Sequence, residues 1–242
     1  MTAHREQLML SRNPFQLSDV LRPSEYSALL IQALHLRADV VRGKRAFEVG
    51  IGSGVVLRAL AELGAAKVGG VDIEPYAVHR GQEILDDLPQ DVVGSIDVGD
   101  MWETVEGERF DLIVANLPHF PAETLELSGR LCSWSAGGRD GRVLLNRFLD
   151  GLDAHLSPDG RALLTHNSFV DVEQSSLRLA TGRFTLKPVV TALVYIADEK
   201  GSLLPPELRA RFDRRALHQY GGHLFGEVHV VEIARPSSTP MV

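Results

Sequence analysis

A glycine-rich turn followed by an acidic residue is the feature of this sequence that most directly indicates chemistry. Residues 47–54 read Phe-Glu-Val-Gly-Ile-Gly-Ser-Gly, which places Gly50, Gly52 and Gly54 between a buried strand and a helix. Glycines let the backbone approach a ligand without a Cβ in the way, and the free N–H groups at the start of a helix favour a polar or anionic group. Asp72 follows at the end of the next strand, where its carboxylate can accept hydrogen bonds from both hydroxyls of a ribose. Together the two features predict a nucleoside cofactor site.

The spacing of the glycines separates the possible nucleoside cofactors. A dinucleotide fingerprint reads G-x-G-x-x-G, whereas this turn reads G-x-G-x-G and has Val55 where the third dinucleotide glycine would stand. The tighter pattern resembles motif I of the class I S-adenosylmethionine-dependent methyltransferases, in which the turn lies against the amino acid and ribose of the cofactor. A tight strand-to-helix turn can also be purely structural, and the position of Asp72 is what favours the cofactor interpretation. A nicotinamide enzyme is disfavoured by the spacing.

A second motif follows the predicted strand 110–115 and reads Asn116-Leu117-Pro118-His119-Phe120. Ligands of α/β sheets bind beyond the carboxyl ends of the strands, so this segment is expected to face the methyl group of the cofactor. It resembles the Asn-Pro-Pro-Tyr motif of methyltransferases that act on planar nitrogens, which are the exocyclic amines of bases and the side-chain amide of glutamine. The side-chain oxygen of Asn116 and the carbonyl of Leu117 can both accept hydrogen bonds from an –NH2 group. These bonds would orient the nitrogen lone pair and stabilise its developing positive charge.

The second motif departs from the family pattern at two positions. Leu117 replaces the first proline, so the fixed φ of proline is lost. His119 stands where an aromatic ring is expected to stack on the planar substrate. It could stack as an imidazole, with Phe120 as the alternative ring, it could act as a general base for a hydroxyl acceptor, or it could be a surface loop histidine. Asn116 could likewise be a turn residue that caps the strand end.

Three further segments strengthen the resemblance, which covers about residues 14–170. Residues 21–26 resemble the Pro-Arg-Pro-Glu-Thr segment of the HemK-type family, the glutamine methyltransferases of peptide-chain release factors. Residues 99–102, Gly-Asp-Met-Trp, match the segment whose acid hydrogen-bonds the adenine amino group, and residues 137–141 resemble the Gly-Gly-x-Asp-Gly run that opens the next helix. The resemblance implies no metal, catalytic residues Asn116, Leu117, Pro118 and His119, and cofactor-binding residues Glu48, Gly50, Gly52, Gly54, Asp72, Ile73, Asp100, Met101 and Asn116.

The elements that must position these residues alternate between strand and helix after residue 43. This order predicts an α/β fold with a Rossmann-like, seven-stranded, mostly parallel sheet, a C-terminal antiparallel strand pair, and helices on both faces. The predicted strands are 45–50, 67–73, 92–98, 110–115, 162–165, 184–196 and 228–234. The predicted helices are 53–63, 75–88, 144–156, 170–179 and 206–217, with a turn at 157–160. We expect one methyltransferase domain over 44–236, preceded by a cofactor-capping or substrate segment at 1–43 and followed by a tail at 237–242.

Composition excludes several classes of protein. The chain of 242 residues is 44% hydrophobic and 24% charged, as is ordinary for a globular domain. A net charge of −7 counts against a bare nucleic-acid binder, and the arginines at 209, 211, 214 and 215 fit a solvated helix face better than a phosphate-binding patch. The apolar stretches are too short to span a membrane and no signal peptide is recognisable, so we expect a cytoplasmic protein. A single cysteine, Cys132, excludes an intramolecular disulfide and a cysteine-based zinc site.

The sequence therefore predicts an S-adenosylmethionine-dependent N-methyltransferase that acts on a planar amide or amine, with a protein glutamine as the leading acceptor and S-adenosylhomocysteine as product. A small-molecule methyltransferase with His119 as base is the first alternative, and an RNA base methyltransferase is the second. A cofactor-binding protein without catalysis is disfavoured, because the glycine turn and the ribose acid are intact. Residues 1–43 are too few for the N-terminal helical domain of bacterial HemK-type proteins, so substrate choice is expected to involve the C-terminal portion around 206–223. Short eukaryotic members of the glutamine branch use a small activating subunit, and no residue pattern here tests that need.

Overall fold

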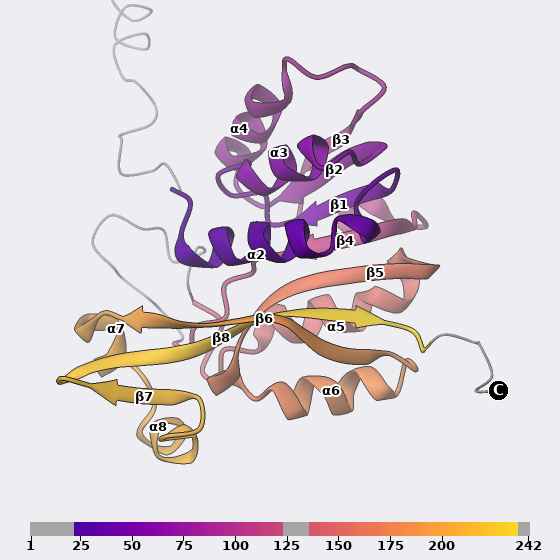
Figure 1. The fold of residues 1–242 in the computed structure, drawn as a ribbon. Coiled ribbons are helices and arrows are strands. Elements are labelled where there is room, and N and C mark those ends of the chain that lie inside the picture. The colour runs from indigo at the N-terminus through magenta and orange to yellow at the C-terminus, as the bar shows by residue number, and fades with distance from the viewer. Residues whose placement is uncertain (1–21, 123–135, 237–242) are drawn as a thin grey trace, which may run out of the picture.

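The computed structural model describes residues 22–122 and 136–236, and a mixed sheet of eight strands forms its centre (Figure 1). The strand order is β3-β2-β1-β4-β5-β8-β6, and a short β7 pairs with β8. The first five strands in this order are parallel, and β8 runs antiparallel to its neighbours. The strands are β1 (Arg45–Val49), β2 (Lys67–Asp72), β3 (Val93–Val98), β4 (Phe110–Ala115), β5 (Leu156–Asn167), β6 (Thr185–Ile196), β7 (Leu217–Tyr220) and β8 (His223–Ala234).

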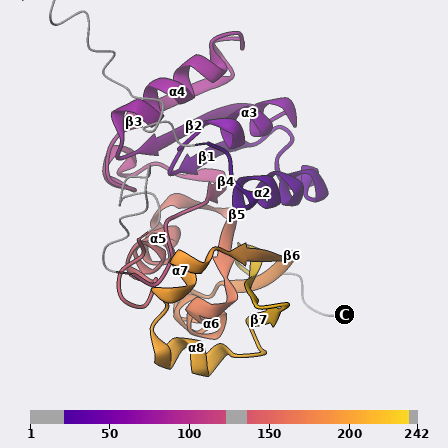
Figure 2. The same cartoon turned by 90° about the vertical axis from the view of Figure 1, so that its left-hand side faces the viewer.

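Helices cover both faces of the sheet. Two separate apolar cores result, one that includes buried residues of α2, α3 and α4 and one that includes buried residues of α5 and α6. In Figure 2, α2 and α5 lie on opposite sides of β4 and β5. The double cover explains why β4 is apolar on both faces from Leu112 to Ala115. The helices are α2 (Glu25–Leu36), α3 (Val55–Glu62), α4 (Pro75–Leu85), α5 (Val143–His155), α6 (Val172–Ala180), α7 (Asp198–Ser202) and α8 (Pro206–Phe212), with 3₁₀ turns η2 (Ala38–Val40), η3 (Glu103–Val105) and η5 (Ser168–Val170).

The predicted fold class is confirmed, and three local predictions need correction. The helix predicted over 206–217 ends at Phe212, because Asp213 is extended and Arg214 has φ 58°. The residues beyond it form β7, an eighth strand, which is joined to β8 by Gly221 and Gly222. Both glycines have positive φ, 56° and 86°, as a two-residue hairpin turn requires.

The turn predicted at 157–160 lies within the bounds of β5. Phe110 pairs with Leu156 and Leu112 with Arg161, so the extra residues of β5 form an irregularity in the register. Helix α2 was not among the predicted helices, although four buried apolar residues, Leu29, Leu30, Ala33 and Leu34, stand at helical spacing. Cys132, residues 1–21 and residues 237–242 lie outside the described residues. In the part of the chain that is described, no helix is long and apolar enough to cross a membrane.

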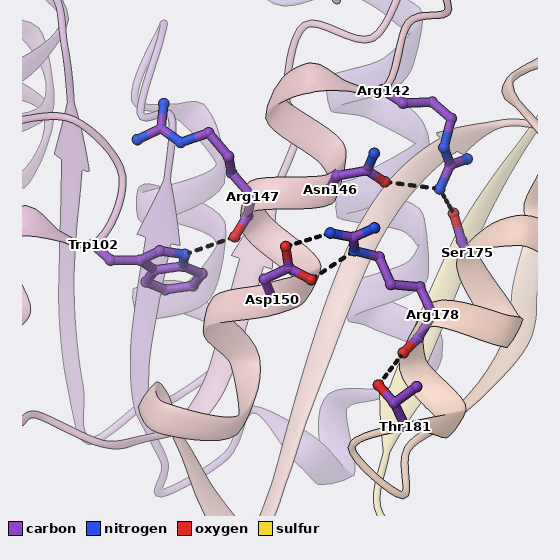
Figure 3. A network of polar contacts seen from close by, with 8 residues as sticks. All are labelled: Trp102, Arg142, Asn146, Arg147, Asp150, Ser175, Arg178 and Thr181. Carbon is purple, nitrogen blue, oxygen red and sulfur yellow. Dashed lines mark hydrogen bonds and ion pairs between the residues drawn. The ribbon is translucent and has the colours of Figure 1, made fainter.

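Trp102 packs against helix α5 at Gly151, where the absence of a side chain leaves room for the indole ring. The indole Nε1–H of Trp102 donates to the carbonyl of Arg147 at 3.2 Å (Figure 3). Its ring stacks on Phe148 and His155 with centroid separations of 5.4 and 4.7 Å. A Cβ on Gly151 would lie 2.1 Å from the indole nitrogen, so the glycine makes room for the ring.

We therefore expect Gly151→Ala to destabilise the protein, although alanine forms helix better than glycine by about 1 kcal/mol. Overpacking of this kind costs about 1–3 kcal/mol, and denaturant unfolding monitored by circular dichroism measures the difference. In a Trp102→Ala background the clash is absent, so the same glycine replacement should stabilise. An equal effect of Gly151→Ala in both backgrounds would contradict this packing account.

Candidate active site

A cavity of about 620 Å³ lies at the carboxyl edge of the parallel strands. This edge is where α/β sheets bind ligands. Of the predicted site residues, Glu48 and Gly54 are not among those that line the cavity. The others line it together, namely Gly50, Gly52, Asp72, Ile73, Asp100, Met101, Asn116, Leu117, Pro118 and His119.

The glycine turn after β1 is tied to the end of β2. Gly50 and Gly52 have φ values of 81° and 54°, a region that residues with a Cβ rarely adopt. The Gly50 N–H donates to the carbonyl of Val71 at 2.8 Å, and the Gly52 N–H donates to the Asp72 carboxylate at 2.9 Å. The turn and the acid predicted from the sequence are therefore one hydrogen-bonded unit.

Asp72 is held in place by backbone donors on both of its oxygens. Oδ2 accepts from Gly52, and Oδ1 accepts from the N–H of Glu74 at 2.9 Å. Burial raises the pKa of this carboxyl group above its usual value. A carboxylate offers about four acceptor positions, so the two backbone bonds leave room for two hydroxyl donors.

Gly54 and Glu48 are the two predicted cofactor-binding residues that do not line the cavity. A Cβ on Gly54 would lie 3.1 Å from the Ile84 side chain and 3.3 Å from the Cα of Gly81, so this glycine allows α3 and α4 to pack closely. The Glu48 side chain is buried, and its Oε2 has no hydrogen-bond partner among the described residues. Its burial, and then the nearby charge of Asp72, raise its pKa well above the usual value. Because neither residue lines the cavity, the cofactor-binding role predicted for Glu48 and Gly54 stays a prediction.

Asp100 and Met101 follow β3 and line the same cavity. One oxygen of Asp100 forms an ion pair with Arg147 of α5 at 3.1 Å. Both partners are partly exposed, so the pair contributes little to stability, and the other carboxylate oxygen stays available. Met101 is buried with φ 61°, a strained conformation for a residue with a side chain.

Asn116 directly follows β4 and is fixed from the neighbouring strand. Its Oδ1 accepts a hydrogen bond of 2.7 Å from the hydroxyl of Thr165, which is fully buried in β5. The carbonyl of Leu117, one residue further, also faces a donor, since Nδ1 of His119 lies within hydrogen-bond distance of it. A hydrogen bond from a neighbouring strand thus holds the Asn116 side chain. A residue that only caps the end of its own strand would not need this contact.

His119 is buried, so the interpretation as a surface loop histidine is wrong. Its Nε2 accepts the backbone N–H of Asn167 at 3.1 Å, which leaves Nδ1 as the protonated nitrogen that donates to Leu117. Burial lowers the pKa of His119 to about 4. The Nε2 lone pair that a general base needs is therefore already occupied, and the edge of the Tyr26 ring lies against the imidazole at a centroid distance of 5.9 Å.

The cavity also contains residues that the sequence prediction did not assign to the site. Tyr26 of α2 and Asn167 of β5 line it, and the Tyr26 hydroxyl donates to the Asn167 side chain at 2.9 Å. Further lining residues come from the end of β6 and from α7, namely Val194, Tyr195, Ile196, Ala197, Glu199 and Lys200. Tyr26 and Asn167 are separated by 141 positions, and no local pattern links them. Among the residues that the structure describes, no cluster of His, Cys, Asp and Glu could hold a metal ion.

Comparisons with known proteins identify the family to which the chain belongs. Residues 27–122 match the family model of ribosomal protein L11 methyltransferase. Over 162 residues the chain is 34% identical to a Methanocaldococcus jannaschii protein named "Putative protein N5-glutamine methyltransferase", an alignment that covers 66% of this chain and 79% of the relative. The chain spans less than half the length of the curated ribosomal protein L11 methyltransferases that it matches.

Two solved structures share the fold. The E. cuniculi Mtq2-Trm112 complex, described as responsible for methylation of the eRF1 translation termination factor, aligns with TM-score 0.57 and 15% identity over 90% of this chain and 99% of that chain. The T. thermophilus 16S rRNA N2 G1207 methyltransferase RsmC, in complex with AdoMet and guanosine, aligns with TM-score 0.55 and 21% identity over 89% of this chain and 44% of that chain. The fold and the site define a class I methyltransferase. The chain belongs to the S-adenosylmethionine-dependent methyltransferases, within the group that includes the glutamine N5-methyltransferase relative.

The buried histidines predict how stability depends on pH. Burial lowers the pKa of His119 to about 4 and that of His166 to about 3, so the unfolded chain binds more protons than the native protein below about pH 6.5. Stability is therefore full above pH 6.5 and falls as the pH drops toward 4. Between pH 7.5 and 5 each histidine accounts for about 2 kcal/mol of the loss.

Urea unfolding at pH 7.5 and pH 5 tests this expectation. His166→Asn should reduce the difference between the two pH values, because it removes a buried imidazole whose pKa is lowered by burial. Equal acid sensitivity in the wild type and the His166 variant would show that His166 is protonated in the native protein.

Proposed function

We propose that this enzyme transfers the methyl group of S-adenosylmethionine to a neutral planar nitrogen, and that the acceptor is the side-chain amide of a protein glutamine. The observation that carries the proposal is that Asn116 and Leu117, which follow β4 and offer a side-chain oxygen and a backbone carbonyl, both line the cavity. They line the same cavity as the glycine turn and Asp72. When an –NH2 group donates to both oxygens, its two N–H bonds are fixed in direction. The nitrogen lone pair is then also fixed, and it can face the methyl group of the cofactor.

The cofactor is expected to occupy the half of the cavity beside β1, β2 and β3. Gly50 and Gly52 would lie against its amino acid and ribose, and Asp72 would accept the ribose hydroxyls on its unoccupied lone pairs. Asp100 and Met101, which line the same cavity, would contact the adenine. The fit rests on the two glycines that line the cavity without a side chain and on the remaining acceptor capacity of Asp72.

The transfer requires little acid or base chemistry from the protein. The nitrogen lone pair forms the new N–CH3 bond while the S–CH3 bond breaks, so that the positive charge passes from sulfur to nitrogen and S-adenosylhomocysteine leaves. The two oxygens stabilise that charge as it develops, and the nitrogen then loses a proton to water. Because the Nε2 lone pair of His119 is occupied by Asn167, His119 is not assigned the proton transfer.

One electrostatic observation favours the proposed amide over a nucleobase. The net charge of −7 is unfavourable for RNA. The name of the M. jannaschii relative supports the same acceptor.

A labelling experiment tests the acceptor class. The purified enzyme is incubated with S-adenosyl-[methyl-³H]methionine and cell extract, which is then separated into protein, RNA and small molecules. We expect label in protein, and mass spectrometry should locate the added methyl group on a glutamine side chain. Label only in RNA or only in small molecules would overturn the proposed acceptor.

Two single substitutions separate cofactor binding from transfer. Asn116→Ala should lower kcat about 10²–10³-fold, as loss of one preorganised oxyanion-type contact does, and should change the affinity for S-adenosylmethionine by less than a few fold. Asp72→Ala removes two charge-assisted hydrogen bonds and should raise the Kd about 10²-fold or more. Isothermal titration and initial rates measure the two effects. A parallel loss of affinity and turnover in Asn116→Ala would contradict its role in orienting the acceptor.

A further inference from the structure

The two oxygens that are expected to receive the acceptor nitrogen are each bound by a dedicated protein donor. Thr165 donates its hydroxyl to Oδ1 of Asn116 at 2.7 Å, and His119 donates from Nδ1 to the Leu117 carbonyl. Both donors are buried, with exposed fractions of 0% and 5%. A carbonyl oxygen accepts two hydrogen bonds, so each oxygen keeps one lone pair for the acceptor.

Thr165 stands beside Asn116 because of strand register. Ala115 of β4 pairs with Leu164 of β5, so the next residue on each strand lies alongside the other. The buried hydroxyl of Thr165 donates to Oδ1 of Asn116, and this bond fixes the orientation of the Asn116 carboxamide plane. Thr165 does not itself line the cavity, so any effect it has on transfer must pass through Asn116.

His119 connects the loop after β4 to the end of β5. One ring nitrogen binds the carbonyl of Leu117, two residues back in the same loop, and the other binds the backbone of Asn167. The loop is also packed from outside, since a Cβ on Gly137 or Gly141 would lie 2.7 Å from backbone atoms of His119. The side chain thus constrains the backbone at Leu117, where the family motif has a proline with fixed φ.

The β5 end of this connection is anchored deeper in the fold. His166 Nδ1 lies 2.8 Å from the carbonyl of Asn167, and its Nε2 lies 2.8 Å from the Ser175 hydroxyl. Ser175 accepts a hydrogen bond from Arg142, as Figure 3 shows. An arginine can only donate, so the serine proton is free for His166. The donor and the acceptor are therefore defined for every hydrogen bond in the series Arg142–Ser175–His166–Asn167–His119–Leu117.

We propose that Thr165 and His119 are positioning residues for methyl transfer, which aim the Asn116 side-chain oxygen and the Leu117 carbonyl at the acceptor nitrogen. The inference rests on the proposed function for its kinetic consequence, whereas the hydrogen bonds themselves can be tested without any acceptor. It replaces the roles of stacking ring and general base that the sequence leaves open for His119. It also assigns Thr165, which no sequence motif indicates.

Thr165→Val and Thr165→Ser form a matched pair for the kinetic test. Valine keeps the shape and removes the donor, whereas serine keeps the donor. With the extract fraction that wild-type enzyme labels as acceptor, kcat of Thr165→Val should fall at least about 10-fold because the reacting groups are less well oriented. Affinity for S-adenosylmethionine should change less than twofold, and Thr165→Ser should retain most of the activity. Equal activities of wild type and Thr165→Val, or equal losses in both variants, would overturn the assignment of Thr165.

Histidine NMR tests the other half of the device on the free protein. In ¹⁵N-histidine-labelled enzyme at pH 7, we expect a neutral His119 protonated on Nδ1, identified by the loss of its signals in His119→Phe. Its shifts should stay constant from pH 8 to pH 5. A proton on Nε2, or titration near pH 6.5, would overturn the hydrogen-bond arrangement. If wild-type enzyme labelled no extract fraction while the Nδ1–H form was observed, the proposed function would fail and the geometry would stand.

His119→Asn and His119→Phe complete the kinetic comparison. Asparagine can place an amide N–H near the position of Nδ1, whereas phenylalanine restores an aromatic ring without a donor. We expect kcat to fall more in the phenylalanine variant than in the asparagine variant. Between pH 6 and 8, the pH profile of kcat should contain no inflection that is present in wild-type enzyme and absent in His119→Asn. Higher activity of His119→Phe than of His119→Asn would restore the stacking role and overturn the proposal.

Discussion

The parallel pairing of β4 with β1 on one side and β5 on the other is the constraint on which this site depends. Ala115 pairs with Val49 and with Leu164 in the same row of the sheet. The residue that follows in each strand is therefore Gly50, Asn116 or Thr165, side by side at the carboxyl edge. One register thus places the glycine turn, the acceptor-orienting amide and the donor that fixes this amide next to one another. A shift of one residue would turn every side chain of the moved strand to the other face.

The site is built on polar groups that are buried in the fold. Hydrogen bonds inside a protein are stronger than in water, but a buried polar group without a partner is costly. His119, His166 and Asn167 meet this requirement by bonding to one another and to backbone groups, and burial keeps both histidines neutral by lowering their pKa values to about 4 and about 3. The fixed dipoles around the cavity are in place before an acceptor arrives, which is the condition for effective stabilisation of a developing charge.

Local patterns in the sequence were sufficient to predict the α/β class, the glycine turn and the acid after β2, because each depends on residues close together in the chain. The packing role of Gly54 was harder to predict, because its contact with α4 joins elements that only the folded structure brings together. The predicted helix 206–217 overlaps strand β7 at Leu217, and only the pairing of β7 with β8 shows that residues 217–220 form a strand.

The roles of Thr165, Tyr26 and Asn167 could not be predicted, because their contacts join residues 48 to 141 positions apart. His119 shows the same limit within a recognised motif. Its type and position suggested an aromatic substitute or a base, and the carbonyl and N–H that occupy its two nitrogens are supplied by the folded loop and by β5. The chemistry of a motif residue is thus decided by partners that the motif does not contain.

A structure of the enzyme with S-adenosylhomocysteine and a glutamine-containing peptide from the labelled protein would test the central claim most directly. The account predicts that the glutamine side-chain nitrogen lies about 3 Å from both Oδ1 of Asn116 and the Leu117 carbonyl oxygen, with the cofactor sulfur on its opposite side and the Thr165 and His119 bonds intact. A side-chain nitrogen beyond hydrogen-bond reach of these oxygens, or an acceptor bound away from the loop after β4, would contradict it.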